Sequence, residues 1–394
     1  MKVSRSIALV GGAVMFSVAG PAIATAAASP RGEQGGANRV VGQVYVNDNT
    51  VGANTVAGYD RHADGSLTPL SGSPFATGGS GSGGGLGSQG SLQASPDGRY
   101  LLAVDAGSNQ ISVLRIKDDG RLVLAEGGVV SSGGIKPVSI AITERGDRND
   151  LVYVANGGVG GESYTGFTFS DNGRLRPLAG STFALPDGSA AGDVLFNGDG
   201  STLAGTRDGT SQIDSFSVDR GGRLHAAPGS PFSGQGLGQI GAEFRPTNDD
   251  QLFVSNAHNG PGLGTVSAFH VGRHADLTSI GDGPYADQQT APCWVEISHD
   301  GRFLFTTNTA QPSVSTYSIA RNGALTLIGS TPLDATLQKG PTDLRLSPSG
   351  KVLYVLTAGG HAITTFAVDG GSLTPLGALT ALPAGSSPVG IVVV

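Results

Sequence analysis

The sequence contains a repeat in which two apolar stretches follow one another. In each copy a polar residue ends the second apolar stretch. The residues at this position are Asn47, Asp105, Asn156, Arg207, Asn256, Asn308 and Thr357. Asparagine tolerates left-handed backbone angles and bonds to its own turn, so turn formation accounts for much of this column. Asp105 and Arg207 depart from it, and we select them as a candidate base and a candidate anion-binding group. If the positions share one face, Asn156, Asn256 and Asn308 are candidate ligand-binding residues.

A second column begins the first apolar stretch of each copy. It holds Ser91, Ser139, Asp193, Gly241, Trp294, Asp343 and Gly390. Trp294 is the only tryptophan in the chain. Its indole could form a flat platform for a ligand, or it could fill space as a wedge between packed sheets. The neighbouring Cys293 fits a small buried residue, because a nucleophilic thiol would need an adjacent base.

Charged residues also occupy the first apolar stretch itself. Two positions after the second column lie Gln93, Glu243, Glu296 and Arg345. Unpaired charges in a buried strand are costly, so we expect Glu296 and Arg345, in neighbouring copies, to form a structural pair. Glu243 has no evident partner in the sequence, and we therefore select it as a candidate catalytic carboxylate.

Two histidines lie in expected loops. His258 and Asn259 belong to the insertion SNAHNGPGLG, and His361 belongs to AGGH. Loop histidines are usually only solvated, but an imidazole can also act as a general base near neutral pH, which makes His258 a catalytic candidate. The sequence contains no HExxH, CxxC, GxSxG or phosphate-binding loop, and we predict neither a metal nor a cofactor.

The elements that position these residues follow from the repeat. Its clearest copy spans residues 91–116, and related copies span 294–319 and 342–368. Each copy reads as an apolar strand, a Ser-Pro-Asp-Gly-like turn, a second apolar strand, and later a Gly-x-Leu element. A period of about 45 to 50 residues and 65 glycines predict many short strands in one circular array. We predict an all-β, seven-bladed β-propeller with four-stranded antiparallel blades.

The ends of the chain suggest how such a ring closes. The first blade, from Val40, matches the second, third and fourth strands of the phrase but lacks the first. The last residues, PVGIVVV at 388–394, match an opening strand. We predict that they complete blade one and remove an exposed edge, whereas the alternative is an ordinary terminal edge strand. The glycine-rich stretch 76–90 is predicted to be a loop.

Composition limits location and partners. A formal charge of -7 with scattered basic residues argues against nucleic-acid binding. The N-terminus has the basic, apolar and A-x-A pattern of an export signal, although an N-terminal membrane anchor is the alternative. We expect a signal peptide at 1–26, a disordered leader at 27–39 and the propeller at 40–394. The mature protein would be secreted or envelope-associated, monomeric, without a membrane span, and without a disulfide because Cys293 is the only cysteine.

Several segments carry a family resemblance. They are SPDGRYLLAV, the Gly-Arg-Leu elements, GSPF at 72–75 and 229–232, and APCWVEISHDGRFLFTTN. In these segments the chain resembles the seven-bladed lactonase-like propellers, the group of 6-phosphogluconolactonase and carboxymuconate cyclase. The segments VYVAN, LFVSN and LFTTN also resemble the YVTN-type repeats of exported surface proteins.

The first resemblance implies where catalytic residues would lie. In catalytic members, a Pro-Arg-His start of one inner strand and an Asn-Glu exit of its partner bring Arg, His and Glu to the channel mouth. The best-matching segments here read Pro292, Cys293, Trp294 and Asn308, Thr309. The Arg-His pair and the Glu are therefore absent at these positions, which argues against 6-phosphogluconolactonase activity itself.

Two functions fit the sequence. The first is an exported lactonase-type hydrolase or related cycloisomerase, acting on a small lactone or acid at the channel mouth. Asp105, Glu243 or His258 would activate water, and Arg207 would hold a carboxylate or developing oxyanion. The second is a non-catalytic exported propeller that binds a cell-envelope component or a protein through the same face.

Overall fold

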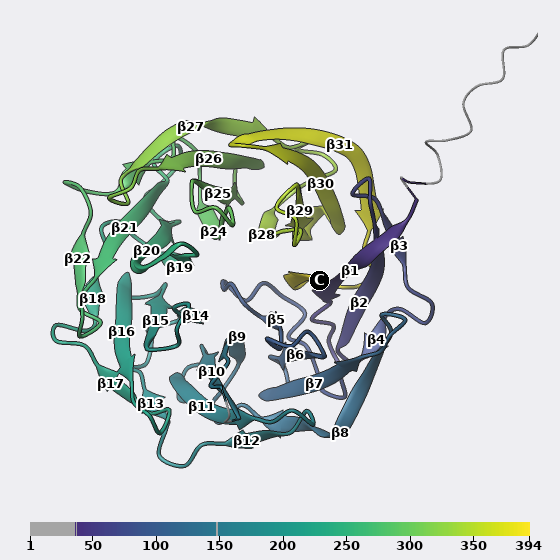
Figure 1. Cartoon of the computed structure of the whole chain (residues 1–394), viewed down its shortest axis with the longest axis horizontal. Helices are drawn as coiled ribbons and strands as arrows, with labels where there is room; N and C mark the ends of the chain where they lie inside the picture. Colours follow the sequence, from purple (N-terminus) through teal and green to yellow (C-terminus); the bar gives the residue numbers. More distant parts are fainter. Residues whose placement is uncertain (1–35, 37, 147–148) are drawn as a thin grey trace, which may run out of the picture.

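Seven antiparallel sheets stand around a central axis in a computed structural model that describes residues 36, 38–146 and 149–394 (Figure 1). The predicted seven-bladed all-β propeller is confirmed. The expected signal peptide and most of the expected leader lie outside the described residues. Within the described part, the chain forms no helix with the length and apolar character needed to cross a membrane.

The blades follow one another along the chain, and the strands of each blade run from the centre of the ring outward in the order below. Blade 1 consists of β32 (Val389–Val393), β1 (Val40–Asn47), β2 (Thr55–His62), β3 (Leu67–Pro69) and β4 (Phe75–Ala76). Blade 2 consists of β5 (Leu92–Ala94), β6 (Tyr100–Asp105), β7 (Gln110–Ile116) and β8 (Leu122–Ser131). Blade 3 consists of β9 (Pro137–Thr143), β10 (Asp150–Asn156), β11 (Ser163–Phe169), β12 (Leu175–Pro177) and β13 (Phe183–Ala184).

The remaining blades repeat this order. Blade 4 consists of β14 (Ala191–Phe196), β15 (Thr202–Arg207), β16 (Gln212–Val218), β17 (Leu224–Ala226) and β18 (Phe232–Ser233). Blade 5 consists of β19 (Gln239–Arg245), β20 (Asn248–Asn256), β21 (Thr265–Val271), β22 (Leu277–Ser279) and β23 (Tyr285–Ala286). Blade 6 consists of β24 (Pro292–Ile297), β25 (Phe303–Asn308), β26 (Ser313–Ile319) and β27 (Leu325–Pro332). Blade 7 consists of β28 (Pro341–Leu346), β29 (Val352–Thr357), β30 (Ala362–Asp369) and β31 (Ser372–Ala381), with the short 3-10 helix η1 (Ala358–Gly360) after β29.

The carboxyl terminus closes the ring as predicted. Strand β32 pairs antiparallel with β1, with Tyr45 opposite Val392 and Val46 opposite Ile391. Ile391 is completely buried. A strand from the end of the chain therefore covers the inner edge of the first blade, which would otherwise be unpaired.

The Ser-Pro-Asp-Gly turns join the first two strands of a blade through their own side chains. In blade 2 the Ser95 hydroxyl donates to Asp97 Oδ1 at 2.7 Å, and the same oxygen accepts the Arg99 N–H at 3.0 Å. Gly98 has a φ of 69°, a left-handed conformation that glycine adopts at low cost. The turn motif thus explains both the strand pairing and the repeat.

The blades pack on one another through apolar side chains and tyrosines. Tyr45 of blade 1 donates to the Gly120 carbonyl of blade 2 at 2.6 Å. Tyr153 of blade 3 likewise donates to the Gly222 carbonyl of blade 4 at 2.8 Å. Because these side chains are fully buried, their hydroxyls need such partners, and the contacts fix the angle between blades.

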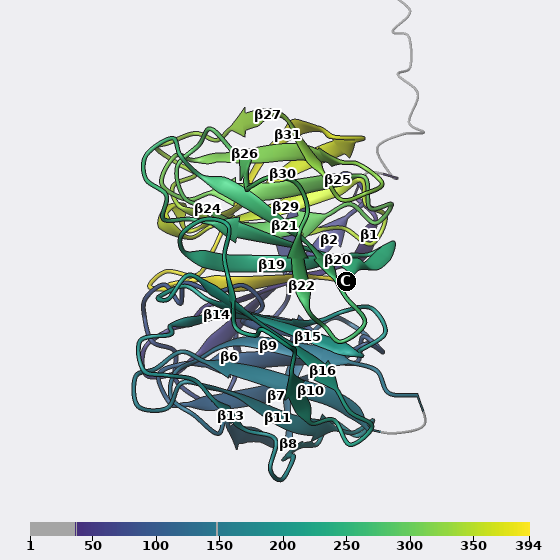
Figure 2. The same ribbon diagram turned by 90° about the vertical axis from the view of Figure 1, so that its left-hand side faces the viewer.

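The ring has two distinct faces, visible edge-on in Figure 2. We call the face where inner strands begin and second strands end the mouth face. The opposite face, which carries the turns between first and second strands, we call the turn face. All residues of the two sequence columns lie toward the mouth face, because each inner strand pairs antiparallel with the second strand of its blade.

Candidate functional site

A pocket of about 220 Å³ opens on the mouth face between blades 6, 7 and 1. It is lined by Gly85, Leu86, Gly87, Trp294, Thr342, Ala358, His361, Ser387, Pro388, Val389 and Gly390. We call it the mouth pocket. Its walls combine a tryptophan, a histidine, two hydroxyls and several apolar residues, and they come from five separate segments of the chain.

Trp294 stands at the start of β24 and joins the pocket to the core. The residue is 7% exposed, and its indole Nε1 donates to the Ser88 carbonyl at 2.7 Å. The side chain is therefore largely buried, as expected of a residue that fills space between sheets, and it also lines the pocket, as a ligand platform would. Whether it binds a ligand stays a prediction.

The glycine-rich loop, residues 77–91, crosses the channel and is here called the strap. In Figure 1 the segment leading to β5 reaches the centre of the ring. Gln89 donates to the Val295 carbonyl at 2.7 Å and accepts the Val295 N–H at 3.0 Å, so its amide pairs with the free edge of β24. Ser88 donates to the Val138 carbonyl of blade 3 at 2.8 Å. The predicted loop therefore also plugs the channel.

The strap residues at the pocket wall have backbone N–H groups without protein partners in the part of the chain that the structure describes. Within the described residues, the backbone N–H groups of Gly85, Leu86 and Gly87 donate no hydrogen bond to protein. All three residues line the mouth pocket. Backbone N–H groups without protein partners at the wall of a pocket are suitable donors to a developing oxyanion.

His361 supplies the only imidazole among the lining residues. It follows η1 with a φ of 49°, and its backbone N–H donates to the Ala358 carbonyl. Within the described chain, its ring makes no hydrogen bond, and the residue is exposed. Thr342, from β28, places a hydroxyl on the same wall and donates weakly to the Leu356 carbonyl at 3.4 Å.

His258 lies elsewhere on the mouth face, next to a carboxyl group that the sequence did not reveal as its neighbour. Its Nδ1 is 3.5 Å from Asp208 Oδ1, and neither residue lines the mouth pocket. Burial raises the pKa of Asp208, and His258 opposes that rise. Burial also raises the pKa of the nearby Cys293 thiol to about 12, with the Asp208 charge adding to the effect. Cys293 is a buried residue as expected, not an activated nucleophile.

The expected pair of Glu296 and Arg345 is confirmed inside the channel. Arg345 Nη1 lies 2.8 Å from Glu296 Oε2. Glu243, for which the sequence indicated no partner, lies beside them and accepts the Ile297 N–H at 2.9 Å. Burial and the Glu296 charge together raise the pKa of Glu243 well above its usual value.

These channel carboxylates share a structural task. The inner strands of neighbouring blades do not pair with one another, so their backbone N–H groups need other acceptors. Glu296 accepts the Leu346 N–H of blade 7 at 2.8 Å, and Asp343 accepts the Ile391 N–H of blade 1 at 3.2 Å. Asp193 accepts the Ala242 N–H of blade 5 at 3.1 Å in the same manner. Each carboxylate thereby ties its blade to the next.

Both departures in the strand-exit column are engaged by other side chains, Asp105 by residues of blade 1 and Arg207 by a residue of its own blade. Asp105 is fully buried and accepts from Asn54 Nδ2 at 2.8 Å and from the Thr77 hydroxyl at 2.7 Å. Burial raises its pKa, and these hydrogen bonds oppose the rise. Arg207 forms a double hydrogen bond with Asp214, at 2.6 and 2.5 Å. Neither residue lines the mouth pocket, and their roles as base and anion-binding group stay predictions.

The three asparagine candidates are also buried and bonded within their blades. Asn156 donates to the Ser163 hydroxyl at 3.2 Å, and Asn308 donates to the Ser315 hydroxyl at 2.9 Å. Asn256 donates to the Ser267 hydroxyl at 2.8 Å. These partners lie on the adjacent third strand, so the contacts stabilise the strand pair. Ligand binding by these residues stays a prediction.

Sequence reasoning missed the strap, Thr342 and Asp208. Thr342 lies between Pro341 and Asp343 on β28, one position from the aligned column, so the alignment passed over it. Asp208 follows Arg207 directly, so it also lies one position away from the aligned column. The length of the glycine-rich segment was a signal that it could span the ring.

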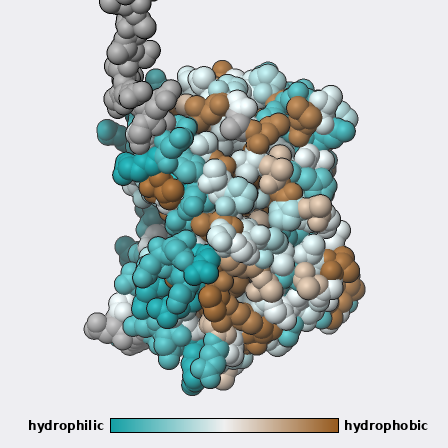
Figure 3. Space-filling model, turned by 90° about the vertical axis from the view of Figure 1, so that its right-hand side faces the viewer, coloured by the Kyte–Doolittle hydropathy of each residue, from teal (hydrophilic) through white to brown (hydrophobic). Residues whose placement is uncertain are grey.

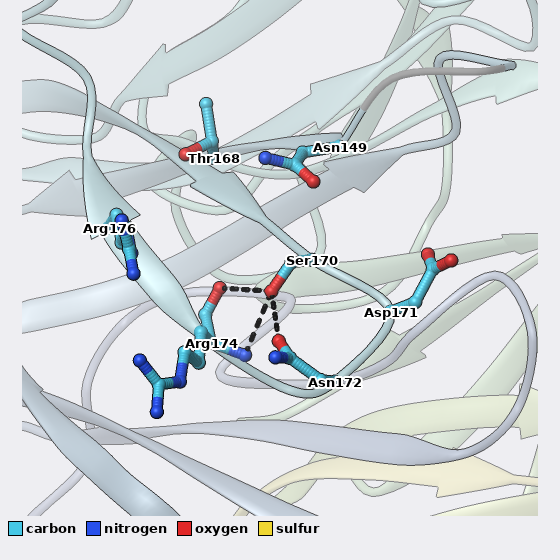
Figure 4. A pocket seen from close by; sticks show the side chains of 7 residues that line it. All are labelled: Asn149, Thr168, Ser170, Asp171, Asn172, Arg174 and Arg176. Carbon is cyan, nitrogen blue, oxygen red and sulfur yellow. Dashed lines mark hydrogen bonds between the residues drawn. The ribbon is translucent and has the colours of Figure 1, made fainter.

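A larger hollow lies on the turn face of blade 3 (Figure 4). It measures about 460 Å³ and is lined by Asn149, Thr168, Ser170, Asp171, Asn172, Arg174 and Arg176. Ser170 donates to Asn172 and accepts the Arg174 N–H at 3.3 Å, as a turn between two strands requires. Within the described ranges, no group of three or more His, Cys, Asp or Glu side chains is placed to hold a metal. The mouth pocket, which has a histidine and a tryptophan in its wall, is the candidate site.

Comparison with known proteins supports the architecture. A model of the family described as lactonase, 7-bladed beta-propeller matches residues 244–388, within blades 5 to 7. This match confirms the resemblance to that family over these blades, whereas the YVTN resemblance stays a prediction. None of the curated proteins compared with the sequence matches it.

Solved structures share the fold at low identity. A protein assigned as a 6-phosphogluconolactonase from Bacteroides uniformis is 18% identical with a TM-score of 0.70, over 90% of this chain and 99% of that one. A second from Bacteroides fragilis is 21% identical with a TM-score of 0.67, over 89% and 96%. The periplasmic gluconolactonase of Pseudomonas aeruginosa is 18% identical with a TM-score of 0.70, over 89% and 98%. At these identities the likeness shows the fold alone.

Proposed function

We propose that this chain is a lactonase-type hydrolase that opens a small lactone in the mouth pocket. The observation that carries the proposal is that His361 and the backbone donors of Gly85, Leu86 and Gly87 line one pocket. Ester hydrolysis needs a base for water and donors for the oxyanion, and this pocket offers both. The family match over blades 5 to 7 supports the same reaction class.

The reaction would proceed by direct attack of water. His361 accepts one proton from the water as its oxygen bonds to the lactone carbonyl carbon. The carbonyl oxygen becomes an oxyanion, which the strap N–H groups stabilise. The oxyanion then re-forms the carbonyl and breaks the ring C–O bond, and the ring oxygen takes the proton from His361. One lactone and one water thus give one hydroxy acid.

This proposal places the base away from the family position. The inner strand of blade 6 begins with Pro292, Cys293 and Trp294, without the Arg and His of catalytic relatives. Here the imidazole would come from the loop after β29 in blade 7. The lactone ring would instead have Trp294 as an apolar neighbour.

The test is hydrolysis of a lactone panel, followed by acid release at constant pH. Exchange of His361→Gln should lower kcat by about 100-fold or more with a smaller change in KM. His299→Gln is the matched control, because His299 is an exposed histidine on the turn face. Normal activity of the His361→Gln variant would overturn the assignment, and loss in His258→Gln alone would move the base to the His258–Asp208 pair.

A binding function is the second candidate, favoured by the way the strap fills the channel and by the internal bonding of Asp105 and Arg207. In that case the mouth face would bind a cell-envelope component. Purified protein would then hydrolyse no lactone of the panel but would sediment with isolated envelopes. Ordinary kinetics on a defined lactone would exclude this candidate.

We also propose that residues 1–26 direct export. The support is the basic, apolar and A-x-A pattern in the sequence. Amino-terminal sequencing of protein recovered outside the cytoplasm should then find a chain that begins after Ala26. Recovery of the intact amino terminus in the membrane fraction would favour the anchor instead.

A further inference from the structure

In its described residues, the mouth pocket offers backbone N–H donors but no cationic side chain to a phosphate. Among the described lining residues there is no Lys, Arg, Asp or Glu. A phosphate ester carries a charge of about -1.5 to -2 near neutral pH and is usually met by Arg or Lys side chains or by a helix N-terminus. A buried charge without such partners is strongly unfavourable.

The apolar part of the wall is well defined. Leu86 is 6% exposed and Val389 is 6% exposed, so both belong to the packed interior as well as to the pocket. Pro388 and Trp294 extend this wall. A ligand that fills the pocket would therefore meet carbon atoms on several sides.

The surroundings of the pocket are also poor in charge. In the loops that join strands on the mouth face, the exposed Asp, Glu, Lys and Arg side chains are Asp187, Asp334 and Lys339, and Lys136 and Asp208 are partly exposed. The same loops expose large aliphatic residues at 41–73%, namely Val51, Ile135, Val159, Leu237, Leu263 and Leu337. Figure 3 shows the contrast, with hydrophilic residues gathered on the turn face at the left of the view.

Two of these aliphatic residues flank the pocket itself. Val51 pairs with Gly81 of the strap through an isolated parallel bridge. The Leu337 carbonyl lies close to Gly360, next to His361. The approach to the pocket is therefore apolar on the strap side, whereas on the blade 7 side the exposed Leu337 shares its loop with the exposed Lys339.

We propose that the mouth pocket takes an uncharged lactone with an alkyl or aryl substituent, rather than a phosphorylated sugar lactone. This inference rests on the proposed function. The lactone carbonyl would face the N–H groups of Gly85, Leu86 and Gly87, and the substituent would contact Trp294, Leu86 and Val389. Lys339 is an exposed cation beside Gly359 at the rim, and it is therefore included in the test.

Binding can be measured without turnover, because Trp294 is the only tryptophan and reports directly on the pocket. The probes are γ-nonalactone, glucono-δ-lactone and 6-phosphoglucono-δ-lactone, each titrated into the full mature chain while the fluorescence is recorded. We expect γ-nonalactone to bind at least about tenfold more tightly than the phosphorylated lactone. Leu86→Ser should weaken γ-nonalactone binding by about tenfold, with folding checked by circular dichroism. Lys339→Ala should leave it unchanged.

The wild-type panel keeps the test valid even if Leu86→Ser fails to fold. Tighter binding of 6-phosphoglucono-δ-lactone, or a fluorescence that no lactone changes, would overturn the inference. Binding of γ-nonalactone without hydrolysis would support this ligand class and contradict the proposed reaction. Preferred hydrolysis of the phosphorylated lactone would support the reaction and contradict this ligand class.

Discussion

Removal of the Arg207 guanidinium should destabilise blade 4 strongly. Arg207 Nε and Nη2 contact the two carboxylate oxygens of Asp214 at 2.6 and 2.5 Å. The two side chains are 5% and 1% exposed, and Tyr164 donates a further hydrogen bond to Asp214 at 2.9 Å. Burial opposes the charge of Arg207, but the bonds and charge of Asp214 outweigh it and raise the pKa of the guanidinium.

The size of the effect follows from the carboxylate that is left behind. In Arg207→Met, Asp214 would keep the Tyr164 hydroxyl but would lose both charged donors in a site closed to water. Breaking a buried pair in this way costs about 3–5 kcal/mol in the free energy of unfolding. Arg99→Met is the matched control, because its pair with Asp97 is 53% and 40% exposed. Its loss should change the free energy of unfolding far less, because water screens an exposed pair.

Urea unfolding, followed by circular dichroism and Trp294 fluorescence, measures both variants. A double variant, Arg207→Met with Asp214→Leu, should recover most of the loss, because an apolar pair of similar volume replaces the ion pair. The reasoning would be refuted by an Arg207→Met protein as stable as the control variant. If an Arg207→Met protein of unchanged stability no longer bound lactone, Arg207 would be the anion-binding group that its position at the exit of the second strand suggested.

Three further perturbations test closure, pH dependence and the strap. Ile391→Ala should lower the free energy of unfolding in urea by about 2–5 kcal/mol, and deletion of residues 388–394 should leave an insoluble protein. Ile328→Ala is the control and should be nearly neutral, because Ile328 is 56% exposed. Burial raises the pKa of Asp343 to about 7, so the folded state holds its proton more tightly than the unfolded state. Stability should therefore fall as pH rises from about 4 to 7, and Asp343→Asn should flatten that slope in urea midpoints; an unchanged slope would contradict this. Gln89→Ala should lower the free energy of unfolding by about 1–3 kcal/mol and red-shift the Trp294 emission, because the N–H and the carbonyl of Val295 lose their partner. Gln311→Ala, at an exposed position, should do neither.

The fold could be predicted from the sequence because the repeat acts as an internal alignment. The missing first strand of blade 1 and the apolar PVGIVVV segment together predicted the pairing of β32 with β1, which the register of Tyr45 and Val392 confirms. The pairing of Glu296 with Arg345 was also predictable, since opposite charges in neighbouring inner strands are costly unless they meet.

The partners of the strand-exit residues could not be read from turn preferences. Asp105 accepts from Ser112, Arg207 binds Asp214, and Asn308 donates to Ser315. Each partner lies seven residues later, on the third strand. Because Arg207 pairs with Gln212 in the strand register, Asp214 is its diagonal neighbour on the same face of the sheet. A spacing of seven with complementary side chains was therefore the signal that sequence analysis lacked.

The strap was not predictable for a different reason. A glycine-rich segment has few side chains to specify a path, and its position depends on which inner-strand edges remain unpaired in the closed ring. Gln89 finds such an edge at Val295, on the far side of the channel. No local pattern in residues 76–90 identifies that partner, so only the complete ring determines where this loop lies.

The contacts of the strand-exit residues and of the channel carboxylates show that a polar side chain in a propeller channel can serve the fold alone. The exit column joins second to third strands, as Arg207 does with Asp214, and the channel carboxylates join successive blades, as Glu296 does with the Leu346 N–H. Polar side chains at both sets of positions are needed by the fold itself, whatever the protein binds. On the proposed function, the chemistry would then fall to groups on loops at the mouth, where His361 and the strap residues Gly85, Leu86 and Gly87 lie. Since loops vary without altering the blades, a seven-bladed propeller can keep its architecture while the residues at its mouth differ.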